Sequence, residues 1–346
     1  MKKAFLSLIT SILIFFLLFS PVDANLLEIY FFDVGQGDAS LIKTPAGKVV
    51  LIDSGPSRDI ILRHLEQFNI DQIDLVIASH AHADHISGMG EIITKYQPRA
   101  FIDPGLAHTT KTYERMINAL IENDINYYEG TSRKITLGNI ELTILPPAEP
   151  FISQSELNNN STVVRLDYQN FSCLYAGDIE KERERKLSSR VYSLLDVDIL
   201  KVPHHGSSSS STPAFIKTVS PDIAIISCGK ENRYGHPHDE ALALYYNLDI
   251  DIYRTDQHGT ILVQTDGSDY TIQTETDAPR APPVKIEESK KDDSSEYNYA
   301  ASKKSKVFHY IDCSSVKQIS PENLVLFKTR EEAVASGRRP CKRCNP

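Results

Sequence analysis

Cysteine and positive charge are both scarce over most of this chain. Only five of its 346 residues are cysteines, and none of them precedes residue 173. Lysine and arginine number 37 against 46 aspartate and glutamate residues, which gives a formal net charge of −9. This acidic balance argues against a uniformly basic coat for nucleic acid, although it allows local basic patches.

Long apolar runs are also rare, and the clearest one lies at the N-terminus. Two lysines precede an uncharged run over residues 4–19, and the stretch "VDA" ends at the small residue Ala24. We therefore expect a signal peptide over residues 1–24 and a secreted, extracellular protein with no stable membrane span after cleavage. Because the run is somewhat shorter than the roughly 20 residues of a membrane span, an uncleaved cell-surface anchor is the alternative.

Three of the five cysteines crowd the last 34 residues beside a histidine. They give the spacing His309-x3-Cys313, followed further on by Cys341-x2-Cys344. Exported proteins often pair their cysteines in disulfides, but a Cys/His group at this spacing is typical of a structural zinc site. We expect one structural zinc ion on these four residues.

The hydrophobic pattern predicts a strand-rich α/β domain, and 41% hydrophobic composition is enough to bury a core. Runs rich in β-branched and aromatic residues predict strands within residues 26–35, 49–55, 75–80, 100–105, 140–147, 162–168, 171–178, 197–205, 222–229 and 260–266. Apolar residues at three- and four-residue spacing predict helices over 58–68, 113–123 and 240–247. Cys173 and Cys228 lie inside predicted strands and are interpreted as buried free thiols.

Several polar residues lie where predicted strands stop. They are Asp53, His80, Asp178 and the pair His204 and His205. Loops at strand ends, carried on a rigid sheet, are where α/β enzymes usually build their sites, so these residues are candidates for one. The periodicity leaves open whether the strands form parallel or mixed sheets.

Residues 276–305 combine proline, serine and charged residues with few aliphatic ones. Such a stretch cannot bury enough apolar surface to offset its ordering, so it is interpreted as a disordered linker. It separates a domain over residues 25–275 from a compact segment over residues 306–346. At about forty residues this segment is too small to be stable without a staple, which a bound metal would supply.

The stretch "SHAHADHISG" at residues 79–88 places three histidines and an aspartate within six positions. Alternate residues of an extended loop project to one side, so His80 and His82 can bind one ion. Asp84 and His85 follow on a turn and can face a second ion. Because imidazole and carboxylate suit zinc, manganese or iron, the spacing predicts a metal site on a loop that opens a helix.

The motif "HAHADH" resembles the HxHxDH signature of the metallo-β-lactamase superfamily. From residue 27 to 273 the chain is also similar to the exported hydrolase domain of ComEC-type DNA-uptake (competence) proteins. This similarity rests on "FFDVGQGDASLI", "VVLIDSG", "NNNSTVVRL", "LYAGD", "KVPHHGSSSS" and "ENRYGHPH". It implies a four-layer αβ/βα sandwich with a dinuclear site at one edge. Asp33, Gln36 and Asp38 are interpreted as shaping a glycine-rich turn near that site.

The resemblance assigns metal ligands to five positions of the sequence. His80 and His82 would bind one ion. Asp84 and His85 would bind the other, and Asp178 of "LYAGD" would bridge the two. We therefore expect two divalent ions, zinc or manganese, in the larger domain.

The remaining ligand positions carried over from the family are less regular. In "KVPHHG" the histidine before Gly206 matches the last ligand, which favours His205 and makes His204 its neighbour. Asp53 of "LIDSG" would orient the ligand loop, as metal sites commonly require. The superfamily usually has a further histidine where this chain has "NNNS", and Asn160 is expected to bind there. An amide oxygen is a weaker and harder ligand than imidazole, which favours manganese or leaves one coordination position to water.

The expected reaction is hydrolysis of a phosphodiester. Two adjacent ions lower the pKa of a bridging water and clamp the oxygens of a phosphoryl group. The resulting hydroxide would attack the phosphorus, with Asp84 and Asp178 in the catalytic centre and Asp178 orienting the nucleophile. His236 or Ser207 would stabilise the leaving oxygen. For His236 and His238 of "YGHPH" a proline-stiffened turn is the alternative to a contact with substrate.

The C-terminal stretch "SGRRPCKRCNP" resembles the zinc-binding module of the Ada DNA-repair protein. His309 stands where that protein has its methyl-accepting cysteine, so the resemblance implies a structural zinc without methyl transfer. Residues 301–346 hold ten lysines and arginines against four acidic residues, a local charge of +6. Such a patch suits sequence-independent contact with the DNA backbone. A merely solvated surface, or one that binds an anionic cell-wall polymer, is the alternative.

These observations together predict a secreted dinuclear-metal phosphodiesterase, in the first place an extracellular DNA nuclease with a tethered zinc module. A hydrolase of teichoic acid, of a phosphorylcholine ester or of a lactone is one alternative, because such metal sites also cleave esters, lactones and β-lactams. A non-catalytic protein that binds DNA or cell wall is the other.

Overall fold

The computed structural model describes residues 26–277 and 297–346, apart from residues 312, 314, 317, 318, 321, 322 and 345. The chain divides into two compact units, Met1–Val284 and Lys285–Pro346, and each is described by itself. The predicted signal peptide and most of the predicted linker lie outside the described residues, so both stay predictions.

The larger unit contains two sheets, and the first has eight strands in the order β15-β14-β1-β2-β3-β4-β5-β6. These are β1 (Leu27–Phe31), β2 (Ser40–Lys43), β3 (Val49–Ile52), β4 (Leu75–Ile77), β5 (Ala100–Asp103), β6 (Asn126–Glu129), β14 (Ile261–Thr265) and β15 (Tyr270–Thr274). Strands β3 to β6 pair in parallel, whereas the remaining pairs are antiparallel. The sheet is therefore mixed.

The second sheet has seven strands in the order β13-β12-β11-β10-β9-β8-β7. Its strands are β7 (Arg133–Leu137), β8 (Ile140–Leu145), β9 (Val163–Tyr168), β10 (Phe171–Tyr175), β11 (Ile199–Lys201), β12 (Ile223–Ile226) and β13 (Asp251–Arg254). It is also mixed, because β10 to β13 pair in parallel and β7 to β10 pair antiparallel.

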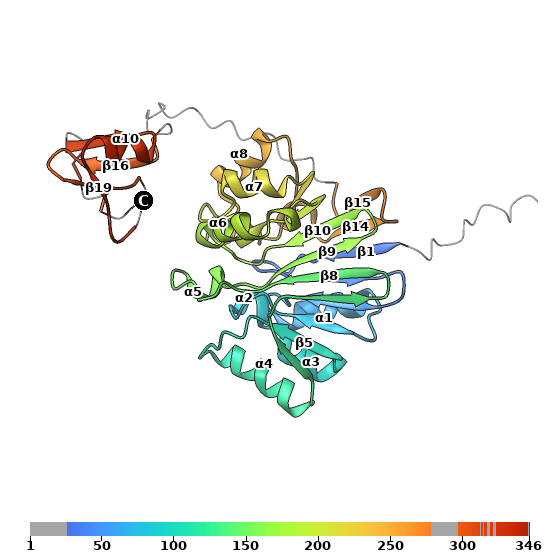
Figure 1. Ribbon diagram of the computed structural model, residues 1–346. Helices are drawn as coiled ribbons and strands as arrows, with labels where there is room; N and C mark the ends of the chain where they lie inside the picture. The colour runs from blue at the N-terminus through green and yellow to red at the C-terminus, as the bar shows by residue number, and fades with distance from the viewer. Residues whose placement is uncertain are drawn as a thin grey trace, which may run out of the picture. The chain divides into compact units, whose positions relative to one another are not determined.

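Helices cover the outer face of each sheet (Figure 1). The first sheet packs against α1 (Arg58–Gln67), α3 (Met89–Tyr96) and α4 (Lys111–Glu122), and the second against α6 (Lys181–Arg190), α7 (Pro213–Val219) and α8 (Asp239–Asn247). In α4 the buried residues Met116, Ala119 and Leu120 recur at the three- and four-residue spacing of one helix face. The expected four-layer αβ/βα sandwich is confirmed, and α1, α4 and α8 lie where the periodicity predicted helices.

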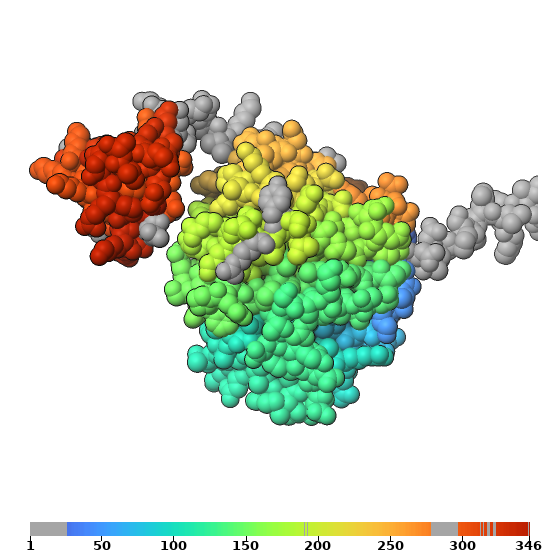
Figure 2. Space-filling model, in the orientation of Figure 1, coloured from blue at the N-terminus to red at the C-terminus, as the bar shows by residue number. Residues whose placement is uncertain are grey.

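The main core lies between the two sheets. Both sheets contribute fully buried aliphatic and aromatic residues to it, and the Phe31 and Tyr175 rings stack across the layers at 5.9 Å. In the space-filling view the two layers form one continuous surface (Figure 2). Cys173 is part of this core, Cys228 is buried under the helices of the second sheet, and both are free thiols, as predicted.

The short elements of the larger unit lie between strands and helices. They are α2 (Ala83–Ile86), α5 (Glu156–Asn159), η1 (Tyr192–Leu194), η2 (Pro203–Gly206) and α9 (Thr255–His258). Because β3 pairs in parallel with β4 and β10 with β11, the loops that follow each pair leave the same end of their sheet. None of the helices in the described ranges combines the length and the apolar character that a membrane crossing requires.

The smaller unit is a four-stranded sheet with one helix. Its elements are β16 (Tyr299–Ser302), β17 (Val307–Tyr310), β18 (Leu324–Phe327), α10 (Arg330–Ala335) and β19 (Arg339–Pro340). A small core of Ala301, Phe308, Phe327 and Ala333 holds the helix against the strands. This core has few large side chains, which fits the expectation that the unit needs a staple.

The expected boundary of this unit at residue 306 is wrong. Strand β16 lies inside the predicted linker 276–305 and pairs with both β17 and β18. Ala300 and Ala301 are fully buried there. Small residues in a polar context carry little hydrophobic signal, which is why the sequence pattern did not mark this central strand.

Candidate metal centre

Backbone hydrogen bonds tie the loops around the candidate ligands together. The N–H of Asp38 donates to the carbonyl oxygen of Asp84 at 3.2 Å, and that of Ser54 donates to the carbonyl oxygen of His85 at 2.7 Å. Gly37 permits this approach, because a Cβ placed on it would lie 2.2 Å from the carbonyl oxygen of Asp84. The turn "DVGQGD" thus fixes the position of the histidine-rich loop.

His80 and His82 follow β4 and point toward a shared space. His80 Nε2 lies 2.8 Å from His82 Nδ1 and 3.7 Å from Asp178 Oδ2. One donor atom from each of these three residues lies within 4.8 Å of the others. The alternation of side chains along extended backbone brings the two rings together, as the sequence spacing led us to expect.

A second group of donor atoms shares Asp178 with the first. It consists of Asp84, His85, Asp178 and His205. Asp178 Oδ2 lies 3.2 Å from His85 Nε2 and 3.5 Å from His205 Nε2. Asp84 Oδ2 lies 3.4 Å from His205 Nε2. The structure therefore places Asp178 between two donor groups, which is the bridging position expected of it.

In the second donor group, the Nδ1 atom of each histidine donates a hydrogen bond to an oxygen outside the group. His85 Nδ1 lies 2.8 Å from Asp53 Oδ2, and His205 Nδ1 lies 3.0 Å from the carbonyl oxygen of Ser227. Because these partners only accept, each Nδ1 carries a proton, and each Nε2 is the ring atom that faces the cluster. Asp53 also accepts the N–H and the hydroxyl of Ser79, both at 2.7 Å. It therefore orients the ligand loop as expected.

A buried lysine, which the sequence did not single out, supports His205 through a second carboxylate. Lys201 Nζ donates to Asp38 Oδ2 at 2.6 Å, and Asp38 Oδ1 lies 3.1 Å from His205 Nδ1. Lys201 is only 2% exposed. Burial by itself raises the pKa of Asp38, but the charges of Lys201 and His205 lower it to about 2. Asp38 therefore places a carboxylate beside a candidate ligand as well as shaping the glycine-rich turn.

The chemistry of the donor set fits divalent cations. Within the described residues, the buried atoms Asp178 Oδ1, His85 Nε2 and His205 Nε2 have no hydrogen-bond partner. Burial by itself raises the pKa of Asp178, but the charges of His85 and His205 hold it well below its usual value. Burial lowers the pKa of both His80 and His82, which favours the neutral rings that coordinate metal. Bound cations would satisfy these otherwise costly buried groups.

A cavity of about 310 Å³ opens over the cluster, lined by Gln36, His82, Ala83, Asp84, Asn158, Asp178, His204, His205, Tyr234 and His236. The ring of His236 stacks on that of His205 at 6.1 Å, and its buried Nδ1 has no partner among the described residues. Burial, together with the charges of His205 and His204, lowers the pKa of His236 to about 4. This ring is therefore neutral near pH 7 and faces the expected reaction space.

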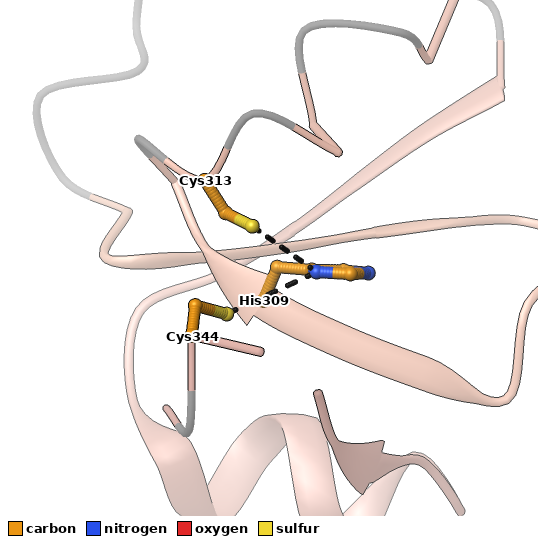
Figure 3. Close-up of side chains that lie close together, drawn as sticks. All are labelled: His309, Cys313 and Cys344. Carbon is orange, nitrogen blue, oxygen red and sulfur yellow. Dashed lines mark hydrogen bonds between the residues drawn. The ribbon is translucent and has the colours of Figure 1, made fainter. Parts of the chain in front are cut away.

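In the smaller unit, His309, Cys313 and Cys344 converge (Figure 3). The sulfur of Cys313 lies 3.5 Å from His309 Nδ1, and that of Cys344 lies 3.9 Å from it. Cys341 lies outside this group of donor atoms, and its sulfur accepts the N–H of Arg343 at 3.4 Å. The N–H groups of Cys344 and Arg343 lower the pKa of Cys341, which favours the thiolate that zinc binds. Three of the four expected zinc ligands are thus assembled.

Comparison with known families agrees with both clusters. A family model described as the metallo-beta-lactamase superfamily matches residues 32–230. The chain belongs to this superfamily. A second model, described as the metal binding domain of Ada, matches residues 287–346. The superfamily implies divalent metals in the larger unit, and the Ada-type match implies zinc in the smaller one.

Individual relatives align with about two thirds of this chain. ComE operon protein 3 of Bacillus subtilis is 33% identical over 256 residues, which cover 68% of this chain and 32% of that protein. Competence protein ComA of Neisseria gonorrhoeae is 25% identical over 247 residues, or 69% and 32%. The chain thus spans about a third of the length of these relatives. The solved metallo-beta-lactamase fold protein YhfI of Bacillus subtilis superposes with a TM-score of 0.47 at 13% identity, covering 69% of this chain and 100% of that one.

In this member of the superfamily Asn160 is not positioned as a ligand, which corrects the expectation. Its Oδ1 accepts the N–H of Ile152 at 3.0 Å, and its Nδ2 donates to the carbonyl oxygens of Ile152 and Glu156. The amide is thus fully used to hold the preceding loop. Asn158 lines the cavity instead, and its buried Oδ1 has no partner among the described residues. A run of three asparagines carries no signal of which one faces the site.

The structure distinguishes the two adjacent histidines of η2. His205 belongs to the second donor group, as expected. His204 lines the cavity, with Nδ1 3.0 Å from Ser209 Oγ and Nε2 3.5 Å from Asn158 Nδ2. It therefore borders the reaction space as a neighbour of the ligands.

Ser207 and His238 do not face the cavity, which corrects their expected contact with substrate. Ser207 Oγ lies 3.0 Å from Ser209 Oγ. His238 Nδ1 accepts the N–H of Ser208 at 2.9 Å, and its Nε2 lies 3.2 Å from the carbonyl oxygen of Tyr234. Both ring nitrogens are thus occupied, and His238 holds the loop on which Tyr234 is carried.

We predict that His205→Ala lowers the metal content of the purified protein by about one ion per chain, whereas His204→Ala leaves it unchanged. The reason is that His205 belongs to the second donor group, whereas His204 belongs to neither group. Inductively coupled plasma mass spectrometry after dialysis measures the content, and the zinc of the smaller unit contributes equally to both variants. Equal metal content in the two variants would contradict the assignment.

We also predict that Cys313→Ala removes about one zinc ion per chain and unfolds the smaller unit, because such a small core depends on its metal. Hydrogen exchange at β16, β17 and β18 should rise to the rate of an unprotected backbone. Cys173→Ala is the matched control, since that thiol lies in the other unit and far from the cluster in sequence. Unchanged protection of the three strands in Cys313→Ala would show that the unit folds without zinc.

Proposed function

We propose that the larger unit is a dinuclear metal-dependent phosphodiesterase and that its substrate is DNA. The observation that carries the proposal is the pair of donor groups that share Asp178. Two adjacent cations form the clamp that many phosphodiester-cleaving enzymes use. Membership of the metallo-beta-lactamase superfamily supports hydrolysis as the reaction class.

Some side chains of the site would bind the ions, and others would bind the substrate. When bound, the ions would supply an activated water and neutralise charge on the phosphoryl group. Asp53 keeps His85, and the carbonyl oxygen of Ser227 keeps His205, in the tautomer that would coordinate. One ion would be held by His80, His82 and Asp178, and the other by Asp84, His85, His205 and Asp178.

Neutral donors on the cavity wall suit the remaining phosphoryl oxygens. The Oε1 atom of Gln36 accepts the N–H of Gly229 at 3.1 Å, which leaves its buried Nε2 without a partner among the described residues. Asn158 and His204 line the same wall. The neutral ring of His236 can donate an N–H hydrogen bond to the leaving oxygen.

DNA is the substrate that the rest of the chain favours. One of the similar proteins is named competence protein ComA, and it is about three times longer than the region it shares. The smaller unit exposes Lys303, Lys304, Lys306, Lys328, Arg330, Arg339, Lys342 and Arg343. A basic surface of this kind binds the phosphate backbone without regard to sequence.

The proposal includes secretion of the protein into the extracellular space. Support for it comes from the charged start, the apolar run and the small-residue site within residues 1–24. A nuclease outside the cell would meet free DNA, and zinc or manganese would reach its site without competition from cytosolic chelators.

The test is cleavage of diesters by the purified protein reloaded with Mn²⁺ or Zn²⁺. We predict that bis-p-nitrophenyl phosphate and single- or double-stranded DNA are cleaved, and that Asp178→Ala lowers both rates at least about a hundredfold because both donor groups lose a member. Tyr128→Ala, which removes an exposed ring that does not line the cavity, should retain DNA cleavage within about threefold.

Two results would contradict the proposal. One is cleavage of DNA that persists in Asp178→Ala. The other is hydrolysis of a lactone or a phosphorylcholine ester, or binding of cell-wall polymer, by a protein that cleaves no DNA under any metal.

A further inference from the structure

A column of aromatic rings leads from the candidate metal centre to the surface. His205, at the centre, stacks on His236 with an interplanar angle of 27°, and His236 stacks on Tyr234 at 5.7 Å with an angle of 21°. His205 is fully buried, whereas Tyr234 is 48% exposed and lines the same cavity. The column thus ends in a half-exposed ring on the wall of the cavity.

The loop that carries Tyr234 is held in place by its own side chains. The amide oxygen of Asn232 accepts the N–H groups of Tyr234 and His236 at 3.2 and 3.0 Å, and its Nδ2 donates to the carbonyl oxygens of Gly229 and His236. His238 Nε2 lies 3.2 Å from the carbonyl oxygen of Tyr234. An exposed ring on a backbone fixed in this way is preorganised for binding, because little ordering remains to be lost.

An arginine accompanies the exposed ring. The guanidinium carbon of Arg233 lies 4.7 Å from the centre of the Tyr234 ring, and its NH2 donates to the Tyr234 hydroxyl. The hydrogen bond to Tyr234, and more weakly the charge of Asp84, raise the pKa of Arg233. Arg233 is fully exposed, so a planar cation and a planar ring stand together beside the metal-binding loop.

We propose that Arg233 and Tyr234 form a binding site for an unpaired nucleotide of the strand whose phosphodiester lies at the metal centre. The base stacks on the planar Tyr234–Arg233 surface, and Arg233 also contacts a flanking phosphate. This inference rests on the proposed function and makes it more specific, since it selects single-stranded nucleic acid or unpaired ends. Bases stacked within a duplex are not available to such a surface, whereas unpaired bases are.

A second Tyr–Arg pair in the same unit provides a matched comparison. The guanidinium carbon of Arg133 lies 5.0 Å from the centre of the Tyr128 ring, and Tyr128 is 44% exposed. Neither residue lines the cavity over the donor groups. Exposure and a cation–π contact are therefore common to both pairs, and only the Arg233–Tyr234 pair adjoins the candidate site.

The test compares cleavage of a single-stranded thymidine oligonucleotide with cleavage of an abasic oligomer of equal length. The full chain, loaded with Mn²⁺, is used throughout. We expect Tyr234→Ala to raise KM for the oligonucleotide about tenfold with kcat retained, and to leave the abasic oligomer within about twofold. Tyr234→Phe keeps the stacking surface and should match the wild type, and so should Tyr128→Ala.

Arg233→Gln separates the phosphate contact from the stacking contact. This variant should weaken cleavage of both oligomers and lower the salt dependence of KM, because a phosphate is common to both substrates. Equal loss of activity on both oligomers in Tyr234→Ala, or no loss on either, would overturn the inference while leaving the proposed function standing. A wild-type protein that cleaves neither oligomer would overturn both together.

Discussion

The fold depends on how the buried charge of Asp178 is balanced. Its carboxylate lies at the edge where the two sheets meet, with Oδ1 buried and unpartnered among the described residues and Oδ2 facing His80, His85 and His205. A buried carboxylate is costly unless cations or hydrogen bonds surround it. The loops after β4, β10 and β11 are arranged to bring cation-binding rings to this one group, which explains why one sheet alone could not form the site.

Support for that arrangement comes from outside the ligands themselves. Asp53 and the carbonyl oxygen of Ser227 hold the proton-bearing nitrogens of His85 and His205, and Lys201 offsets the charge of Asp38 beside His205. These interactions join residues up to 163 positions apart. The Lys201–Asp38 pair therefore spans the sandwich, and removal of either partner would leave the other buried without its main counter-charge.

Much of this could be predicted from the sequence, and the failures have physical causes. Spacing alone brought His80 and His82 together, and the ten strands it marked are all present. Of the five strands it missed in the larger unit, four are the sheet edges β6, β7, β13 and β15, where one face or both meet water and the apolar run is lost. The fifth, β2, follows the glycine-rich turn and has only two apolar residues, Leu41 and Ile42, which are too few to mark a run. Asn158 and Lys201 were missed because their roles depend on residues distant in the sequence. No local sequence pattern marks them.

The most direct test of the central claim is a crystal structure of the protein soaked with Mn²⁺, with the ions located by anomalous diffraction. We expect two ions about 3.5–4 Å apart in the larger unit, both bound by Asp178. One ion, with Asp178 bound to it alone, or an ion coordinated by Asn160, would contradict it.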